Sequence, residues 1–373
     1  LVSVFDILKT NRKISNLVDE DYFPRTLEKL DNRHFEYDPS YDMSIYYLLK
    51  WGSNLIQYYG EKINKYLCLK AKYENALFDE SYDEASSVIE DILQEFGISE
   101  WIYSQKFVLG SLTGNNDGKN EILYLKDVLV SNDLLKMTLA YYEKMANSNI
   151  NYEDYCQSVD KILEKEDGKS IRGRYLNYKL NINTNGSIHE FKSALIIDEQ
   201  ISLIDYYETF INILQNLFNT TKKTPFIKQI VNKLQFIVND FRMRNLYIAL
   251  GGTVKSSQID EYINRIIEKY TTANYTELIN EYNNSLIYRR VDFDLYNIFL
   301  KSNIDIGEMK APHKNLWKEV FAIYNLKYKY ADSVNRIGNY YKLFYNTSWR
   351  YKLCGILSRK LSLSSCIHRQ SCV

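Results

Sequence analysis

Apolar residues recur every three or four positions along most of the chain, and this period is typical of amphipathic α-helices. The clearest case is residues 69–112, where the pattern predicts a helix, a short turn, a second helix, a break at Gly97 and a third helix. Ser81 with Glu84 predicts a capping box at the start of the second helix, and Ser99 is expected to cap the third. The predicted apolar face of the second helix consists of Tyr82, Ala85, Val88, Ile89, Ile92, Leu93 and Phe96.

Part of this segment matches a known repeat pattern. Tyr82 and Ala85 lie three positions apart at the opening of the second helix, Ile89 and Ile92 follow at packing positions, and residues 75–78 look like the end of the preceding helix. The segment therefore resembles the tetratricopeptide repeat (TPR) family through its Y-x-x-A motif. The resemblance implies stacked antiparallel helical hairpins with a concave surface for a protein partner. An ordinary antiparallel helix pair would show the same pattern.

Further helices are expected along the rest of the chain. The periodicity predicts them through 41–79 with breaks at Gly52 and Gly60, through two segments of 121–146 that divide near Asn132, and through 152–165, 194–218 and 225–250. Residues 113–120 have the composition of a loop. Residues 172–191 are also compatible with a β-hairpin that turns at Asn185 and Gly186.

The composition agrees with an all-α protein, because only 14 glycines and 4 prolines leave few residues for the turns of a β or α/β fold. We therefore predict an all-α fold of stacked antiparallel helical hairpins, a TPR-like α-solenoid, with a separate C-terminal helical bundle as an alternative. The pair Gly251-Gly252 is expected to end a helix and to mark a domain boundary. It would divide a TPR-like region, residues 1–250, from a basic, tyrosine-rich helical region, residues 253–373.

Charge is unevenly distributed although the formal net charge is zero. Residues 1–120 contain 20 acidic and 13 basic residues, whereas residues 313–373 contain 2 acidic and 11 basic ones. Oppositely charged ends can orient a docking partner. The basic end also mixes Tyr with Lys and Arg, which suits nucleic acid, although a solvated basic helix face gives the same mixture. The candidate phosphate contacts are Lys327, Lys329, Arg336, Lys342, Arg350 and Lys352.

No motif for catalysis, a metal or a cofactor was found. The GxSxG, HExxH and dinucleotide-binding patterns are missing from the sequence, and five scattered cysteines form no zinc pattern. We therefore expect no cofactor or metal and favour a non-enzymatic role. An enzyme would instead show a polar pocket with perturbed titratable groups. With no apolar run long enough to span a membrane, we expect a cytoplasmic protein, and the first residue, Leu1, suggests a fragment of a longer one.

Three functional hypotheses follow. The first is a cytoplasmic helical scaffold or adaptor that mediates protein–protein interaction within a multiprotein system. The second is a nucleic-acid-binding module that uses the basic end. The third is a helical component of a bacterial anti-phage or toxin–antitoxin system, suggested by the general style of the sequence. The 34 tyrosines fit either a tyrosine-lined binding surface or the codon bias of an AT-rich genome.

Overall fold

The structure, a computed structural model, describes residues 23–31, 43–78, 80–114, 117–182, 186–220, 224–253, 258–284 and 330–347. Within these ranges the secondary structure is helical throughout, which confirms the all-α prediction. The helices are α3 (Leu27–Asp31), α4 (Ile45–Tyr58), α5 (Gly60–Phe78), α6 (Tyr82–Phe96), α7 (Glu100–Thr113), α8 (Asp117–Val128), α9 (Asp133–Ala146), α10 (Tyr152–Leu163), α11 (Ile171–Leu180), α12 (Ile188–Ile201), α13 (Leu203–Thr220), α14 (Thr224–Leu234), α15 (Phe241–Ala249), α16 (Gln258–Thr271), α17 (Tyr275–Asn284) and α20 (Tyr330–Leu343).

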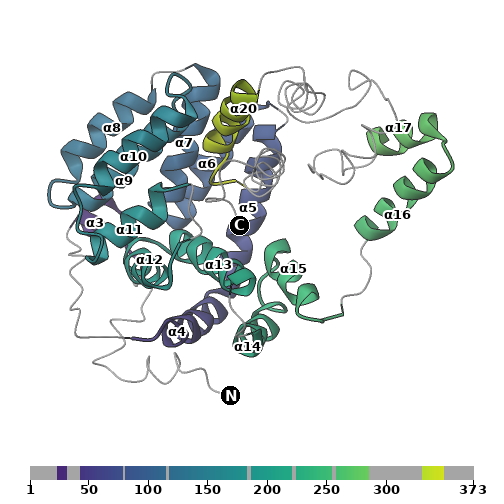
Figure 1. The fold of residues 1–373 in the computed structure, drawn as a ribbon, viewed down its shortest axis with the longest axis horizontal. Coiled ribbons are helices and arrows are strands. Elements are labelled where there is room, and N and C mark those ends of the chain that lie inside the picture. Colours follow the sequence, from purple (N-terminus) through teal and green to yellow (C-terminus); the bar gives the residue numbers. More distant parts are fainter. Residues whose placement is uncertain are drawn as a thin grey trace.

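Helix α13 lies at the centre of the main body and contacts helices from several parts of the chain (Figure 1). It packs against its neighbours α12 and α14, and also against α4, α5 and α7. In a solenoid each repeat contacts only the adjacent repeats. These long-range contacts make the main body a closed helical assembly, and the predicted stacked solenoid is not confirmed.

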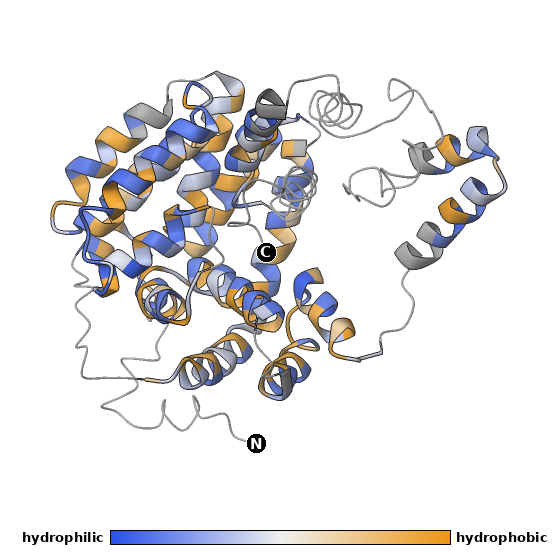
Figure 2. Cartoon of the chain, viewed as in Figure 1, coloured by the Kyte–Doolittle hydropathy of each residue, from blue (hydrophilic) through white to orange (hydrophobic). Residues whose placement is uncertain are grey.

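The sequence of α13 explains its central position. Apolar residues form one broad face of the helix, where buried side chains include Ile204, Tyr207, Phe210 and Leu214. An amphipathic helix buries its apolar face against neighbouring helices. Figure 2 shows the same principle in the surrounding helices, where hydrophobic and hydrophilic residues occupy different sides of the ribbon. The polar side of α13 is enclosed only in part, because Asp205 and Thr209 are buried whereas Asn219 near the helix end is exposed.

Glycine at position 52 allows α4 to approach α13 closely. A Cβ atom built on Gly52 would lie 2.4 Å from the Tyr206 hydroxyl and 2.7 Å from the Phe210 ring. Gly52 thus lies inside α4 and does not break it, whereas the predicted break near Gly60 is present between α4 and α5.

Several sequence predictions about the elements were wrong. The β-hairpin alternative for residues 172–191 is excluded because α11 and the start of α12 occupy the described part of that stretch. The continuous helix over 194–218 is divided at Ser202, whose side chain accepts a hydrogen bond from the Asp205 amide. The helix over 225–250 is divided between α14 and α15, where Asp240 caps the second helix. The loop over 113–120 is shorter than expected, because α8 begins at Asp117.

The hairpin of α5 and α6 contains the repeat-like segment, and the two helices pack together. Ala85, Ile89 and Ile92 are buried, and Tyr82 is half-buried against the core. The Ser81 side chain makes no capping hydrogen bond, so the capping box is wrong, although α6 does begin there. The predicted break at Gly97 is present, and this residue has a positive φ of 78°. The resemblance to the TPR family stays a prediction.

The carboxy-terminal region contributes helices to two places. Helices α16 and α17 form a hairpin that stands apart from the other helices in Figure 1. Helix α20 instead packs against α9 and α10 in the main body. The boundary near Gly251-Gly252 stays a prediction. In the described parts of the chain, none of the helices combines the length and apolar character needed to cross a membrane.

Candidate functional site

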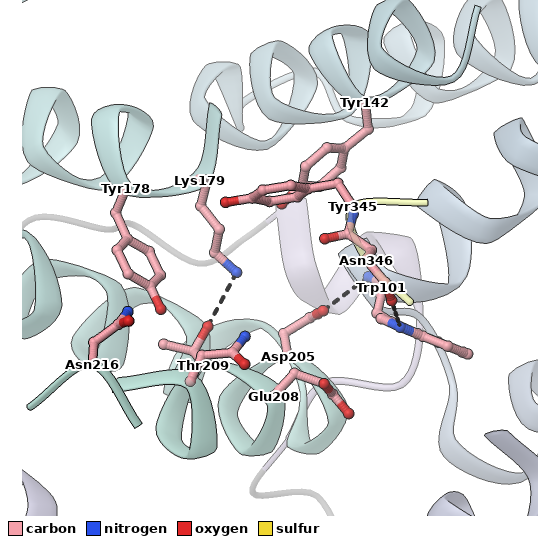
Figure 3. Close-up of a pocket in the computed structure, with 11 residues that line it drawn as sticks. Trp101, Tyr142, Tyr178, Lys179, Asp205, Glu208, Thr209, Asn216, Tyr345 and Asn346 are labelled. Atoms are coloured by element: carbon pink, nitrogen blue, oxygen red, sulfur yellow. Dashed lines mark hydrogen bonds between the residues drawn. The ribbon is translucent and has the colours of Figure 1, made fainter. Parts of the chain in front are cut away.

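A cavity of about 60 Å³ opens between α7, α9, α11, α13 and the residues that follow α20 (Figure 3). Five of its lining residues come from one side of α13, where a spacing of three or four positions places them in a single row. Tyr178 and Lys179 of α11 lie opposite this row, and Tyr345 and Asn346 close one side. The lining residues are Trp101, Tyr142, Tyr178, Lys179, Asp205, Glu208, Thr209, Asn212, Asn216, Tyr345 and Asn346.

A group of buried polar side chains surrounds Lys179 at the base of this cavity. We call it the Lys179 cluster, and it consists of Glu100, Tyr142, Tyr175, Lys179, Asp198, Asp205 and Thr209. The Lys179 ammonium lies 2.8 Å from Asp198 Oδ2 and 3.3 Å from Glu100 Oε2. It also donates to the Thr209 hydroxyl at 3.4 Å, and that hydroxyl donates to Asp198. One ammonium therefore serves two carboxyl groups directly.

The hydroxyl of Tyr175 lies between the same two carboxyl groups. It is 2.8 Å from Glu100 Oε1 and 2.9 Å from Asp198 Oδ1. A phenol has one proton to donate, so it can satisfy only one carboxylate. The second short contact is favourable only when the other carboxyl carries a proton and donates it to the Tyr175 oxygen. The geometry therefore indicates that Glu100 and Asp198 together hold one proton.

The electrostatics of the cluster support this assignment. Burial raises the pKa of Glu100 to about 7; Lys179 opposes the rise, while Asp198 and Asp205 add to it. Burial also raises the pKa of Asp198 and raises that of Asp205 to about 6. Burial alone would lower the pKa of Lys179, but the carboxylates of Asp198 and Glu100 hold it well above its usual range. Lys179 thus stays charged, and the proton belongs to the carboxyl groups.

Asp205 also determines where α7 begins. Its two carboxylate oxygens accept hydrogen bonds from the backbone amides of Glu100, at 2.8 Å, and Trp101, at 2.9 Å. The Ser202 hydroxyl donates a third hydrogen bond at 2.7 Å. A carboxylate at a helix N-terminus satisfies free amides and interacts favourably with the helix dipole. This contact couples the start of α7 to α13.

A second group of buried charges lies on the other side of Glu208. We call it the Arg242 cluster, and it consists of Tyr66, Lys70, Tyr207, Glu208, Asp240 and Arg242. Arg242 contacts Glu208 through two nitrogens, at 2.7 and 3.1 Å, and Asp240 at 2.7 Å. Lys70 lies 2.7 Å from Glu208. Against the effect of burial, Arg242 and Lys70 hold the pKa of Glu208 far below its usual range, and Arg242 lowers the pKa of Asp240.

The residues predicted to contact nucleic acid fall into two sets. Lys327, Lys329, Arg350 and Lys352 lie outside the described residues. Arg336 is exposed on α20. Lys342, on the same helix, is only 2% exposed, and its ammonium donates to the carbonyls of Asn147 and Ile150 at 2.7 and 2.5 Å. Of the two described residues, Arg336 is accessible to a partner and Lys342 is not, and nucleic-acid binding stays a prediction.

The sequence analysis missed every charged residue of the two clusters. One signal was present, because Asp198 and Asp205 fall among the apolar positions of helices that are otherwise largely buried. A charged residue at such a position is rarely enclosed unless it is paired. The partners could not be found in the same way, since Glu100 and Lys179 come from other helices.

The cavity with its perturbed carboxyl groups is the feature that we named as the sign of an enzyme, because such groups cluster at functional sites. All four carboxyl oxygens of Glu100 and Asp198, however, are already in contact with hydrogen-bonding groups of the protein. This arrangement holds charge and a proton in place, which favours binding over reaction. Among the described residues, no group of three or more His, Cys, Asp or Glu side chains is placed to hold a metal ion.

Comparison with known proteins gives one similarity that bears on function. The chain is 20% identical over 318 residues to the Detocs histidine-protein kinase DtcA of Enterobacter cloacae. The similar region includes 81% of this chain but only 28% of the kinase. No known family model and no solved structure matches the chain.

Proposed function

We propose that the chain is a helical, non-catalytic component of a bacterial anti-phage system, acting as the regulatory or partner-binding part of a signalling assembly. The observation that carries this proposal is the similarity to the Detocs kinase, which extends through most of this chain. It favours the third of the sequence-based hypotheses. The kinase activity in the relative's name is not carried over, because the similar region spans 28% of that protein.

The proposal includes protein partners and the cytoplasmic location predicted from the sequence. A closed helical body with two buried charge clusters is suited to hold fixed surfaces for docking. The scaffold hypothesis thus becomes part of the same proposal, with the partner being another protein of the defence system.

A phage challenge in the native host tests the proposal. Deleting the gene should increase the efficiency of plating of at least one phage from a diverse panel, and the wild-type gene should restore protection. Arg242→Met, which leaves buried carboxylates unpaired, should fail to restore it, whereas Asn219→Leu at an exposed position of α13 should succeed. Equal plating on deleted and intact strains for every phage would contradict the proposal.

Capture of the tagged chain from the same host at low and high salt tests the docking role. A stoichiometric protein partner that survives high salt is expected, since burial of apolar surface is little affected by screening. Nucleic acid that is captured at low salt and released at high salt would instead support the basic-end hypothesis.

A further inference from the structure

The cavity beside the Lys179 cluster has a defined size. A buried water needs about 10–15 Å³ of such space, so a volume of about 60 Å³ holds roughly four to six groups of that size. The cavity is partly open, so a longer molecule can insert one end. An occupant that fits inside has about four heavy atoms.

The charge around the cavity favours a cation. The Lys179 cluster has one ammonium and three carboxyl groups, and it remains negative by one charge when Glu100 and Asp198 share a proton. Glu208, on the same cavity wall, is already balanced by Lys70 and Arg242. An anion would meet this excess negative charge, and the Lys179 ammonium is already engaged by three oxygens.

The walls also suit an organic cation. Four aromatic residues, Trp101, Tyr142, Tyr178 and Tyr345, line the cavity together with the side chain of Asn216. Aromatic faces attract cations through their quadrupole, and more strongly when water is excluded. Tyr and Asn oxygens can accept the hydrogen bonds of an ammonium group.

We propose that this cavity binds a small organic cation, an alkylammonium group of about four heavy atoms, between the aromatic walls and the Lys179 cluster. Glu100 and Asp198 lie behind the cavity wall, so the bound cation acts on their shared proton through its charge, from beside Lys179, Asp205 and Thr209. Trp101 donates from its indole nitrogen to the Asn346 carbonyl at 3.0 Å, so an occupied cavity also stabilises the docking of the segment that follows α20. The inference rests on the proposed function in one respect only: in a defence system, the bound cation would be the input signal of this protein.

The test is a calorimetric titration of the full chain at pH 8 with n-propylammonium chloride up to about 20 mM, at constant ionic strength. A ligand of four heavy atoms is expected to show a Kd on the order of 1 mM. The matched controls are n-propanol, which has the same shape without the charge, and sodium acetate. Asn216→Leu fills the cavity, and Asn219→Leu changes the same residue type at an exposed position of the same helix.

We expect saturable binding of n-propylammonium alone, at least tenfold weaker in Asn216→Leu and unchanged in Asn219→Leu. Binding should weaken as the pH falls from 8 to 6, because the shared proton then competes with the ligand, and Glu100→Gln should weaken binding at pH 8. No saturable binding, equal binding of n-propanol, or full binding by folded Asn216→Leu would overturn the proposal. None of these outcomes depends on a phage or a protein partner, so the cation-binding proposal is tested independently of the proposed anti-phage function.

Discussion

The two buried charge clusters are neighbours on α13, yet their carboxyl groups behave in opposite ways. In the Arg242 cluster two cations face two carboxylates, and the pKa values of Glu208 and Asp240 are lowered. In the Lys179 cluster one cation faces three carboxyl groups, and burial raises the pKa values of Glu100, Asp198 and Asp205. The carboxyl groups of both clusters are largely buried. The number of cations, and not burial alone, therefore decides whether a buried carboxyl is ionised.

This difference gives the Arg242 cluster, in which the charges balance, a structural role, and it allows the Lys179 cluster, in which they do not, to respond to pH. A balanced cluster keeps its charges over a wide pH range and fixes α5, α13 and α15 together. An unbalanced cluster takes up or releases a proton near neutral pH and can exchange that proton for another cation. The unbalanced cluster is also the one beside the cavity.

The largest effect is expected from removing the cation of the balanced cluster. Arg242→Met leaves Glu208 with Lys70 alone and Asp240 without a cation, and breaking a buried pair costs about 3–5 kcal/mol. Urea denaturation at pH 7 measures the loss. Arg244→Met, on the same helix but only half-buried, should cost far less. A similar loss in both variants would mean that the Arg242 cluster is not specially stabilising.

Removing the cation of the unbalanced cluster should give a smaller effect that depends on pH. Lys179→Met is expected to lower the free energy of unfolding by about 3 kcal/mol at pH 8 and by about half of that at pH 5, which is below the raised pKa values of Glu100 and Asp205. Denaturant titrations at the two pH values measure this, with exposed Lys161→Met as the control. An equal loss at both pH values contradicts the shared-proton account.

Lys342 is a buried lysine, and among the residues that the structure describes no carboxylate lies at hydrogen-bond distance from it. Burial lowers its pKa to about 8, in contrast to Lys179, and its ammonium donates to carbonyls near the ends of α9 and α10. Lys342→Met leaves these carbonyls without their donor and should destabilise the protein by about 2 kcal/mol. Amide hydrogen exchange should become faster in α20. Unchanged exchange there would show that Lys342 does not hold α20 in place.

The smallest loss of stability is expected from removing the uncharged cap Ser99 at the N-terminus of α7, the same helix end that Asp205 caps. The Ser99 hydroxyl accepts a hydrogen bond from the Ile102 amide at 3.0 Å. Ser99→Ala should cost about 1 kcal/mol, and the same amount from pH 5 to pH 8, because no titrating group is lost. A thermal melting series measures it. A loss as large as that of Arg242→Met would show that this cap matters beyond a single hydrogen bond.

The sequence predicted the helices better than their boundaries. Apolar periodicity identified the buried residues Ala85, Ile89 and Ile92 of α6, because residues on the buried face of a helix recur every three or four positions along the chain. It did not reveal the break at Ser202, whose hydroxyl accepts from the Asp205 amide and donates to the Asp205 carboxylate. That carboxylate also caps a helix distant in sequence. Tertiary contacts of this kind have no local signal.

The candidate site could not be predicted for a similar reason. Its cation and its carboxyl groups come from four helices, so their spacing along the chain carries no pattern. Sequence reasoning instead selected basic residues by composition, and one of them, Lys342, is buried. The useful signal was the row of polar residues on the otherwise apolar α13, which must face either other polar groups or a cavity.

The central claim is that Glu100 keeps a proton in the folded protein that it loses in the unfolded chain. With a folded pKa of about 7 and an ordinary value of 4.5, the folded state binds more protons between these values, so stability falls as the pH rises through this range. Glu100→Gln stays neutral and removes this dependence.

The most direct measurement is the free energy of unfolding of wild type and Glu100→Gln from pH 4 to pH 8. Groups that do not interact with Glu100 cancel in the difference, whereas Asp198, which shares the proton, contributes to it. This difference is expected to shift in favour of the variant by about 3 kcal/mol over that range, from the change in pKa of one group. Parallel curves would show that Glu100 is ionised in the folded protein and that no proton is shared with Asp198.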